Sequence, residues 1–153
     1  ALGSTAVIVR DILQSWDIQV IISSDTSEKP DLLSASDIAI TKSGTSTLQL
    51  ALAGIPMVVG YKVSAVTAFF ARRLLMVKNV SLVNLLLKQE LVPEFLQENC
   101  QPELLARELR SLITNNKNRF TQKQGLLEVA KLLGSKTPPP SERAAYLVMQ
   151  SLS

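Results

Sequence analysis

The chain has 153 residues, 46% of them hydrophobic, which is enough apolar material for the core of one globular domain. It contains no histidine and a single cysteine, Cys100, which excludes a Ser-His-Asp triad, a Cys-His dyad, a histidine-built zinc site and an internal disulfide. The formal net charge of +3 permits an anionic partner, but the basic residues are scattered and lack interleaved aromatic residues, so no nucleic-acid partner is expected. Neither a metal ion nor a cofactor is expected.

The apolar spacing along the chain predicts short strands that alternate with helices. The expected strands cover residues 18–22, 38–40, 57–60 and 80–82. The expected helices cover residues 5–16, 31–35 (a short turn), 102–114, 123–133 and 142–152, with Ser141 as the cap of the last. A polar break is expected over residues 115–122 and a proline linker over residues 134–140.

This alternation predicts an α/β fold, a Rossmann-like parallel sheet flanked by helices, with a helical C-terminus. We expect a partial Rossmann-like domain over residues 1–134, followed by the proline linker and terminal helix over residues 135–153. Four strands are fewer than the roughly six of a complete doubly wound domain. Either the sheet is small or the sequence begins part-way through a larger domain, and a sheet without its leading strands would expose an edge that favours self-association into a homo-oligomer.

The sequence pattern of residues 36–61 predicts a strand, a tight loop, a helix and a second strand, joined as one parallel crossover. Gly54 is expected to end the helix, and Pro56 prevents its continuation. The loop Ser43-Gly44-Thr45-Ser46 would then lie at the carboxyl edge of the sheet, where α/β proteins bind their ligands.

This loop has the composition of an anion site. Ser43 can act as the N-cap, Gly44 lets the backbone approach a ligand closely, and the free N–H groups of the first helical turn favour a phosphate. One interpretation is therefore a cradle for a phosphate or diphosphate. The other is that the Ser-Gly-Thr turn only caps a buried helix, because short Gly/Ser motifs often do so. The Gly-Lys-Ser/Thr spacing of a P-loop is absent.

Residues 62–78 carry an apolar stripe at helical spacing, with cations at one end. The stripe includes Val66, Phe69 and Phe70, and the cations are Arg72, Arg73 and Lys78. Such a helix suits a membrane interface, where apolar side chains enter the headgroup region and cations meet anionic lipid. The alternative is a core helix with a solvated basic face.

A long stretch of the chain, SGTSTLQLALAGIPMVVGYKVSAVTAFFARRLLMVKNVSLVNLLLKQELVPEFLQENCQPELLA, resembles the C-terminal half of bacterial lipid-A-disaccharide synthase, an inverting GT-B glycosyltransferase. The shared motifs are the Ser-Gly-Thr turn, the Ala-Gly-Ile-Pro-Met-Val-Val strand entry, the Val-Ser-Leu-x-Asn-Leu segment and the Glu-Phe-Leu-Gln-Glu run. The resemblance implies transfer of a diacylglucosamine from a UDP donor to a diacylglucosamine 1-phosphate acceptor, which yields the β-1,6-linked lipid A disaccharide 1-phosphate and UDP.

The resemblance also implies roles for residues of this chain. Ser43, Gly44, Thr45 and Ser46 would face the UDP diphosphate, while Asn84 would lie on the nucleotide side and Val66 near the base. Gln49 occupies the position where related transferases place a glutamate that accepts hydrogen bonds from the ribose. Its amide oxygen can still accept, but without charge. None of these residues is expected to be catalytic.

Two features of the family are absent from this sequence. They are the glycine-rich Pro-Gly-Ser-Arg-like loop and the N-terminal acceptor domain, which should carry the catalytic carboxylate. We therefore expect a donor-binding fragment that is inactive alone, in the cytoplasm and peripheral on the anionic inner membrane. The alternatives are a non-catalytic binding or assembly module that kept the fold, and a domain of another UDP-sugar transferase.

Vesicle binding tests the membrane interpretation of residues 62–78. We predict that the chain sediments with anionic vesicles at low salt, because each cation contributes about 1 kcal/mol near such a surface. Arg72→Glu with Arg73→Glu should release the chain, and Phe69→Ser with Phe70→Ser should weaken binding even at low salt. If the aromatic double variant binds vesicles as the parent does but unfolds at a much lower temperature, these phenylalanines belong to the core.

Overall fold

The computed structural model describes residues 3–23, 25–64, 79–134 and 138–151. The membrane-contact prediction falls outside these residues, as does the nucleotide-binding prediction for Val66. The predicted contacts outside them are Phe69, Phe70, Arg72, Arg73 and Lys78. The chain divides into two compact units, Ala1–Ser36 and Asp37–Ser153. The division predicted at residues 134 and 135 stays a prediction.

The first unit contains two helices, α1 (Gly3–Leu13) and α2 (Lys29–Ser34). The strand predicted over residues 18–22 is wrong, because this segment has no strand structure and exposes much of its apolar surface. The exposed fraction is 61% for Ile18 and 81% for Ile21. A strand needs a neighbour whose backbone N–H and C=O groups it can pair with, and the described residues of this unit include no other strand.

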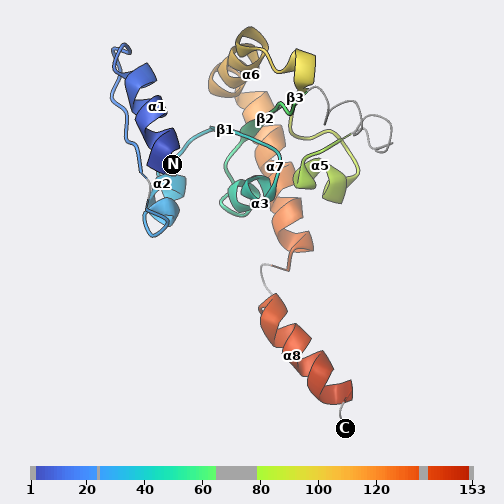
Figure 1. The fold of residues 1–153 in the computed structure, drawn as a ribbon. Helices are drawn as coiled ribbons and strands as arrows, with labels where there is room; N and C mark the ends of the chain where they lie inside the picture. The colour runs from blue at the N-terminus through green and yellow to red at the C-terminus, as the bar shows by residue number, and fades with distance from the viewer. Residues whose placement is uncertain (1–2, 24, 65–78, 135–137, 152–153) are drawn as a thin grey trace. The chain divides into compact units, whose positions relative to one another are not determined.

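The second unit is built on a three-stranded parallel sheet (Figure 1). The strands are β1 (Ala39–Thr41), β2 (Met57–Tyr61) and β3 (Glu94–Leu96), in the order β1-β2-β3. Ala39 pairs with Met57 on one side of β2, and Val59 pairs with Glu94 on the other. The predicted α/β class, a parallel sheet flanked by helices, is confirmed. No strand had been predicted where β3 lies.

Helices cover the central strand on both faces, since Met57, Val58 and Val59 are completely buried. Helices α3 (Thr45–Leu52), α5 (Leu82–Leu87) and α7 (Asn116–Leu132) contact one another, and α6 (Pro102–Thr114) contacts β2. A short 3-10 helix, η1 (Gln97–Asn99), links β3 to α6. The bounds of α6 are those predicted, because Pro102 and Glu103 give a clear helix start and the apolar face is strongly periodic.

Helix α3 ends as the sequence predicted. Gly54 has φ of +69°, in the left-handed region. The N–H groups of Gly54 and Ile55 donate to the carbonyls of Ala51 and Leu50, both at 3.0 Å. This pair of bonds is the Schellman motif, which satisfies two carbonyls at the end of the helix. Ile55 is then buried, where it leads the chain into β2.

Two other predicted boundaries are wrong, and side-chain caps explain both. Residues 80–82 do not form a strand, because Ser81 caps α5 by accepting from the backbone N–H of Asn84 at 3.2 Å. Residues 115–122 are not a break, because Asn115 caps α7 by accepting from the N–H groups of Lys117 and Asn118. In both places a polar residue begins a helix and does not interrupt one.

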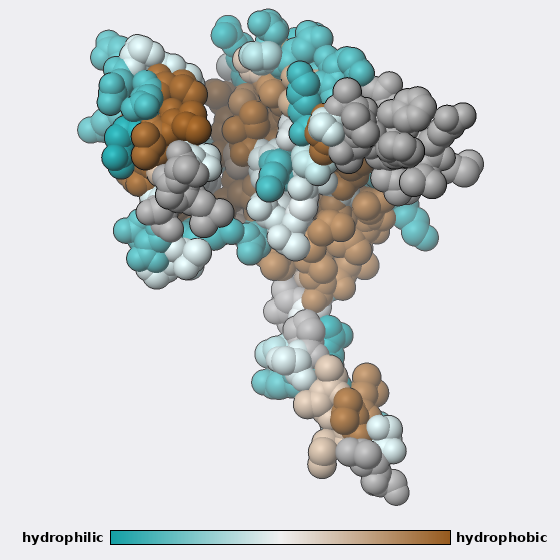
Figure 2. Space-filling view, viewed as in Figure 1, coloured by the Kyte–Doolittle hydropathy of each residue, from teal (hydrophilic) through white to brown (hydrophobic). Residues whose placement is uncertain are grey.

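The last helix, α8 (Pro140–Ser151), begins close to the predicted cap at Ser141. It exposes a run of apolar side chains near its C-terminal end (Figure 2). Between 58% and 68% of each of these residues is exposed, namely Tyr146, Leu147, Val148 and Met149. In the part of the chain that the structure describes, no helix is both long and apolar enough to cross a bilayer.

A buried glutamine on α7 completes the hydrogen bonding of the central strand. The N–H of Val59 donates to the carbonyl of Pro93 at 2.9 Å, toward β3. The N–H of Met57, two residues earlier, points the same way but precedes the paired part of β3. It donates instead to Oε1 of Gln122 at 2.5 Å, and Nε2 of Gln122 donates to the carbonyl of Leu91 at 3.4 Å.

This role of Gln122 can be measured by urea unfolding. We predict that Gln122→Leu lowers the free energy of unfolding by about 1–3 kcal/mol, because the buried N–H of Met57 loses its acceptor. The control is Gln124→Leu, which makes the same change at an exposed position of the same helix and should alter stability little. Equal stabilities of the two variants would contradict the role of Gln122.

Candidate functional site

The loop between β1 and α3 brings the predicted anion-binding residues to the carboxyl end of the sheet. Strand β1 ends at Thr41 and α3 begins at Thr45. Gly44 is the N-cap, with φ of 143° and ψ of −165°, a conformation that is essentially restricted to glycine. A Cβ added to Gly44 would meet nothing within 4 Å, so the space beside the Cα of Gly44 is open.

Three backbone donors are available at this turn. Among the described residues nothing accepts from the N–H groups of Gly44, Thr45 and Ser46, whereas the N–H of Thr47 donates to the carbonyl of Gly44 at 3.1 Å. The first N–H groups of a helix carry the positive end of its dipole, so they favour an anion. Lys42 precedes them, is exposed, and is the one formally charged residue in the sequence from residue 38 to 61. The helix N-terminus and the side chain of Lys42 therefore both favour negative charge.

Ser43 is not the N-cap that the sequence predicted. Its hydroxyl donates to the carbonyl of Val80 at 2.6 Å, 37 residues away. The hydroxyl of Thr47 meanwhile donates to the carbonyl of Gly44 at 2.7 Å. The turn is thus held from both sides, and Ser43 fixes it to the segment that enters α5.

Gln49 lies one helical turn after Thr45, and residues four apart share a helix face. Both side chains are exposed, while Ser46 is half-buried. A ligand bound over the turn would therefore meet Gln49 on the same side of α3. This position agrees with the predicted contact to a ribose, which itself stays a prediction.

Asn84 lies in a buried hydrogen-bond network. Its Oδ1 accepts from the N–H groups of Leu91 and Val92, each at 2.9 Å. Its Nδ2 donates to the carbonyl of Val92 at 2.8 Å and to Oε1 of Glu94 at 2.6 Å. These four bonds use both donors and both lone pairs of the amide. In this structure Asn84 holds the connection between α5 and β3, and its direct contact with a nucleotide stays a prediction.

Glu94, at the start of β3, begins the Glu-Phe-Leu-Gln-Glu run, but the sequence predicted no role for it in the site. Its Oε2 accepts from the N–H of Val80 at 2.7 Å, and its Oε1 accepts from the N–H of Ser81 at 3.0 Å as well as from Asn84. Acidic residues are uncommon in strands, so a glutamate next to the apolar pair Phe95 and Leu96 is a signal in the sequence. Its partners, however, are 10 to 14 residues away along the chain.

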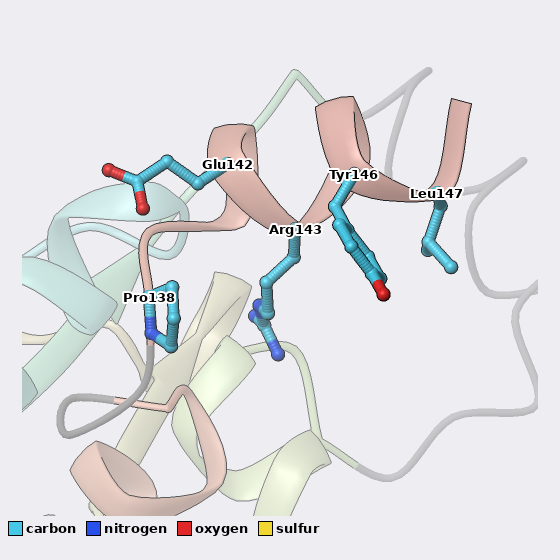
Figure 3. A pocket seen from close by; sticks show the side chains of 5 residues that line it. All are labelled: Pro138, Glu142, Arg143, Tyr146 and Leu147. Carbon is cyan, nitrogen blue, oxygen red and sulfur yellow. The ribbon is translucent and has the colours of Figure 1, made fainter. Parts of the chain in front are cut away.

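A hollow lies along α8, lined by none of the residues of the turn (Figure 3). The residues that line it belong to one short segment, Pro138, Glu142, Arg143, Tyr146 and Leu147. Arg143 and Tyr146 lie on the same side of the helix, whereas Glu142 points away from them (Figure 3). A hollow formed by one helix cannot surround a ligand, so we assign no site there.

Comparison with known proteins gives a consistent result. The model of the family described as lipid-A-disaccharide synthetase matches residues 6–147. Lipid-A-disaccharide synthase of Granulibacter bethesdensis is 43% identical, over 98% of this chain and 41% of the relative. The synthases of Gluconobacter oxydans and Rhodospirillum centenum are 41% and 39% identical, each over 95% of this chain.

The chain spans about 35–41% of the length of these three relatives. The matched part includes the turn at Ser43, the network around Asn84 and the whole sheet. The chain belongs to the lipid-A-disaccharide synthase family.

Proposed function

We propose that this chain forms the donor-nucleotide-binding part of a lipid-A-disaccharide synthase. The observation that carries the proposal is the turn at Gly44, at the carboxyl end of a parallel sheet, where three backbone N–H groups have no acceptor among the described residues and the Cβ position of Gly44 is open. Family membership supports a UDP-sugar as the anion that binds there. The donor would be UDP-2,3-diacylglucosamine.

The residues of the turn would hold the diphosphate and accept the charge of the leaving group. The acceptor hydroxyl attacks the anomeric carbon of the donor, the bond from that carbon to the phosphate oxygen breaks, and UDP leaves with the bonding electrons. The N–H groups of Gly44, Thr45 and Ser46 stabilise the negative charge that develops on the diphosphate. The hydroxyls of Thr45 and Ser46 add donors, and Gln49 accepts from the ribose hydroxyls.

The remaining parts of the reaction are assigned outside this chain. An inverting transfer needs a base that removes the proton of the acceptor hydroxyl. We place that base on an N-terminal acceptor domain, together with the site for the 2,3-diacylglucosamine 1-phosphate acceptor. This chain alone then binds UDP but does not transfer sugar. Because both substrates carry acyl chains, we also propose that residues 62–78 contact the anionic cytoplasmic surface of the inner membrane.

A pair of glycine substitutions at the two ends of α3 tests the donor site. We predict that Gly44→Ala weakens UDP binding by tenfold or more in a calorimetric titration. The new Cβ meets no atom, but φ of 143° costs an alanine on the order of 1–3 kcal/mol, so the turn relaxes and its N–H groups lose their alignment. UDP should also protect the amides of Gly44, Thr45 and Ser46 from hydrogen exchange.

Gly54→Ala is the matched control, because Gly54 also has positive φ and open space but lies at the far end of the helix. It should lose stability, by about 1–2 kcal/mol, and retain the UDP affinity of the parent. If Gly44→Ala binds UDP with the affinity of the parent, the diphosphate does not bind at this turn and the assignment is wrong. A parent chain that binds neither UDP nor UDP-GlcNAc would favour the non-catalytic assembly module instead.

A further inference from the structure

The carboxylate of Glu94 accepts hydrogen bonds from three N–H donors, two in the segment that enters α5 and one in α5 itself. They are the backbone N–H groups of Val80 and Ser81, at 2.7 and 3.0 Å, and Nδ2 of Asn84, at 2.6 Å. Ser81 and Asn84 are completely buried, and Glu94 is half-buried. Hydrogen bonds to an ionised acceptor are among the stronger ones in proteins, so this carboxylate fixes the segment firmly to β3.

The same segment holds the anion-binding turn. Val80 donates its N–H to Glu94 and accepts at its carbonyl from the hydroxyl of Ser43, at 2.6 Å. Ser43 directly precedes Gly44, whose N–H and those of the next two residues are the donors of the site. The peptide group between Val80 and Ser81 therefore links Glu94 to the turn, because its N–H donates to Glu94 and its carbonyl accepts from Ser43.

We infer that Glu94 is a positioning residue for the diphosphate-binding turn. It touches no substrate and acts by holding the carbonyl of Val80 where Ser43 can donate to it, which fixes the direction of the N–H groups at residues 44–46. The inference rests on the proposed donor site, to which it adds a residue from a different strand. It gives a role to the charged side chain that lies beside a buried asparagine.

A glutamine cannot replace this carboxylate, because its amide has one oxygen and a nitrogen that donates. In Glu94→Gln either the N–H of Val80, or the pair formed by Ser81 and Asn84, faces another donor. The bond from Ser43 to Val80 then loses its support, although the size of the side chain is unchanged. Ser43→Ala removes the last link of the same chain and leaves the carboxylate in place.

The experiment is a double-mutant cycle on the whole chain, read by calorimetric titration with UDP. Glu94→Gln and Ser43→Ala should each weaken UDP binding about tenfold. The double variant should be no weaker than the weaker single variant, because both changes break one chain of bonds. A hundredfold loss in the double variant would mean independent effects and would overturn the inference, as would parent-like affinity in Glu94→Gln.

Two controls separate positioning from loss of stability. Gln122→Leu, which removes the buried hydrogen bond to Met57 at the amino end of β2, should lower stability and retain UDP affinity. Glu90→Gln makes the same chemical change at an exposed glutamate four residues away and should change neither. If Gln122→Leu weakens UDP binding as much as Glu94→Gln does, the effect is general destabilisation and the inference is wrong.

An NMR measurement without ligand tests the role of Glu94 separately from the proposed binding of UDP. The amide resonances of Gly44, Thr45 and Ser46 should move in Glu94→Gln and stay in place in Glu90→Gln. A parent chain that fails to bind UDP refutes the donor site, and the amide shifts then decide alone whether Glu94 positions the turn. Unmoved amides refute the role of Glu94 whatever the affinity for UDP.

Discussion

The parallel pairing of β2 with both of its neighbours is the constraint on which the rest of the second unit depends. Because the three strands run in the same direction, their last residues, Thr41, Tyr61 and Leu96, end at the same edge of the sheet. The strand between them is buried on both faces, so helices must cover it on each side. The turn at Gly44 lies at the carboxyl edge of the sheet because it follows β1, which pairs in parallel with β2.

Buried or half-buried polar side chains form the hydrogen bonds of the backbone where the short strands end. Gln122 accepts from Met57 before β3 begins, Asn84 accepts from Leu91 and Val92, and Glu94 accepts from Val80 and Ser81. An unsatisfied buried N–H costs about 1–3 kcal/mol, which explains why irregular segments carry such residues. Among the described residues, no buried side-chain nitrogen or oxygen lacks a partner. The segment that is bonded to the candidate site at Val80 is therefore held in place although it is not part of the sheet.

The same arrangement reconciles an anion site with a nearby carboxylate. The oxygens of Glu94 are directed at three N–H donors, and the donors at the turn are backbone groups whose direction is set by the fold. A site made of oriented backbone dipoles needs little reorganisation when charge develops on a bound diphosphate. Fixing the turn in advance also lowers the entropy lost on binding. The hydrogen bonds that stabilise the sheet edge are thus the same ones that we propose prepare the turn for a diphosphate.

The sequence by itself determined the features that depend on neighbouring residues. The crossover from β1 through α3 to β2 followed from apolar spacing, the end of α3 from Gly54 and Pro56, and the bounds of α6 from Pro102 and its periodic apolar face. The family resemblance, carried by contiguous motifs, was also legible in the sequence and is confirmed. These features rest on local backbone preferences and on patterns within a few turns of chain, so no distant contact is needed to specify them.

Only the tertiary structure decided which groups the polar side chains hydrogen-bond to. Ser43 could cap its own helix, but it donates instead to Val80, which the fold brings next to it. Residues 80–82 have the composition of a strand, yet the bonds to Glu94 and the cap at Ser81 turn them into a helix start. Residues 18–22 also have the composition of a strand. They form none, because the described residues of their unit include no strand with which they could pair. In each case the outcome depends on groups far away in the sequence, because a hydrogen bond or a strand pair needs a partner that only folding supplies.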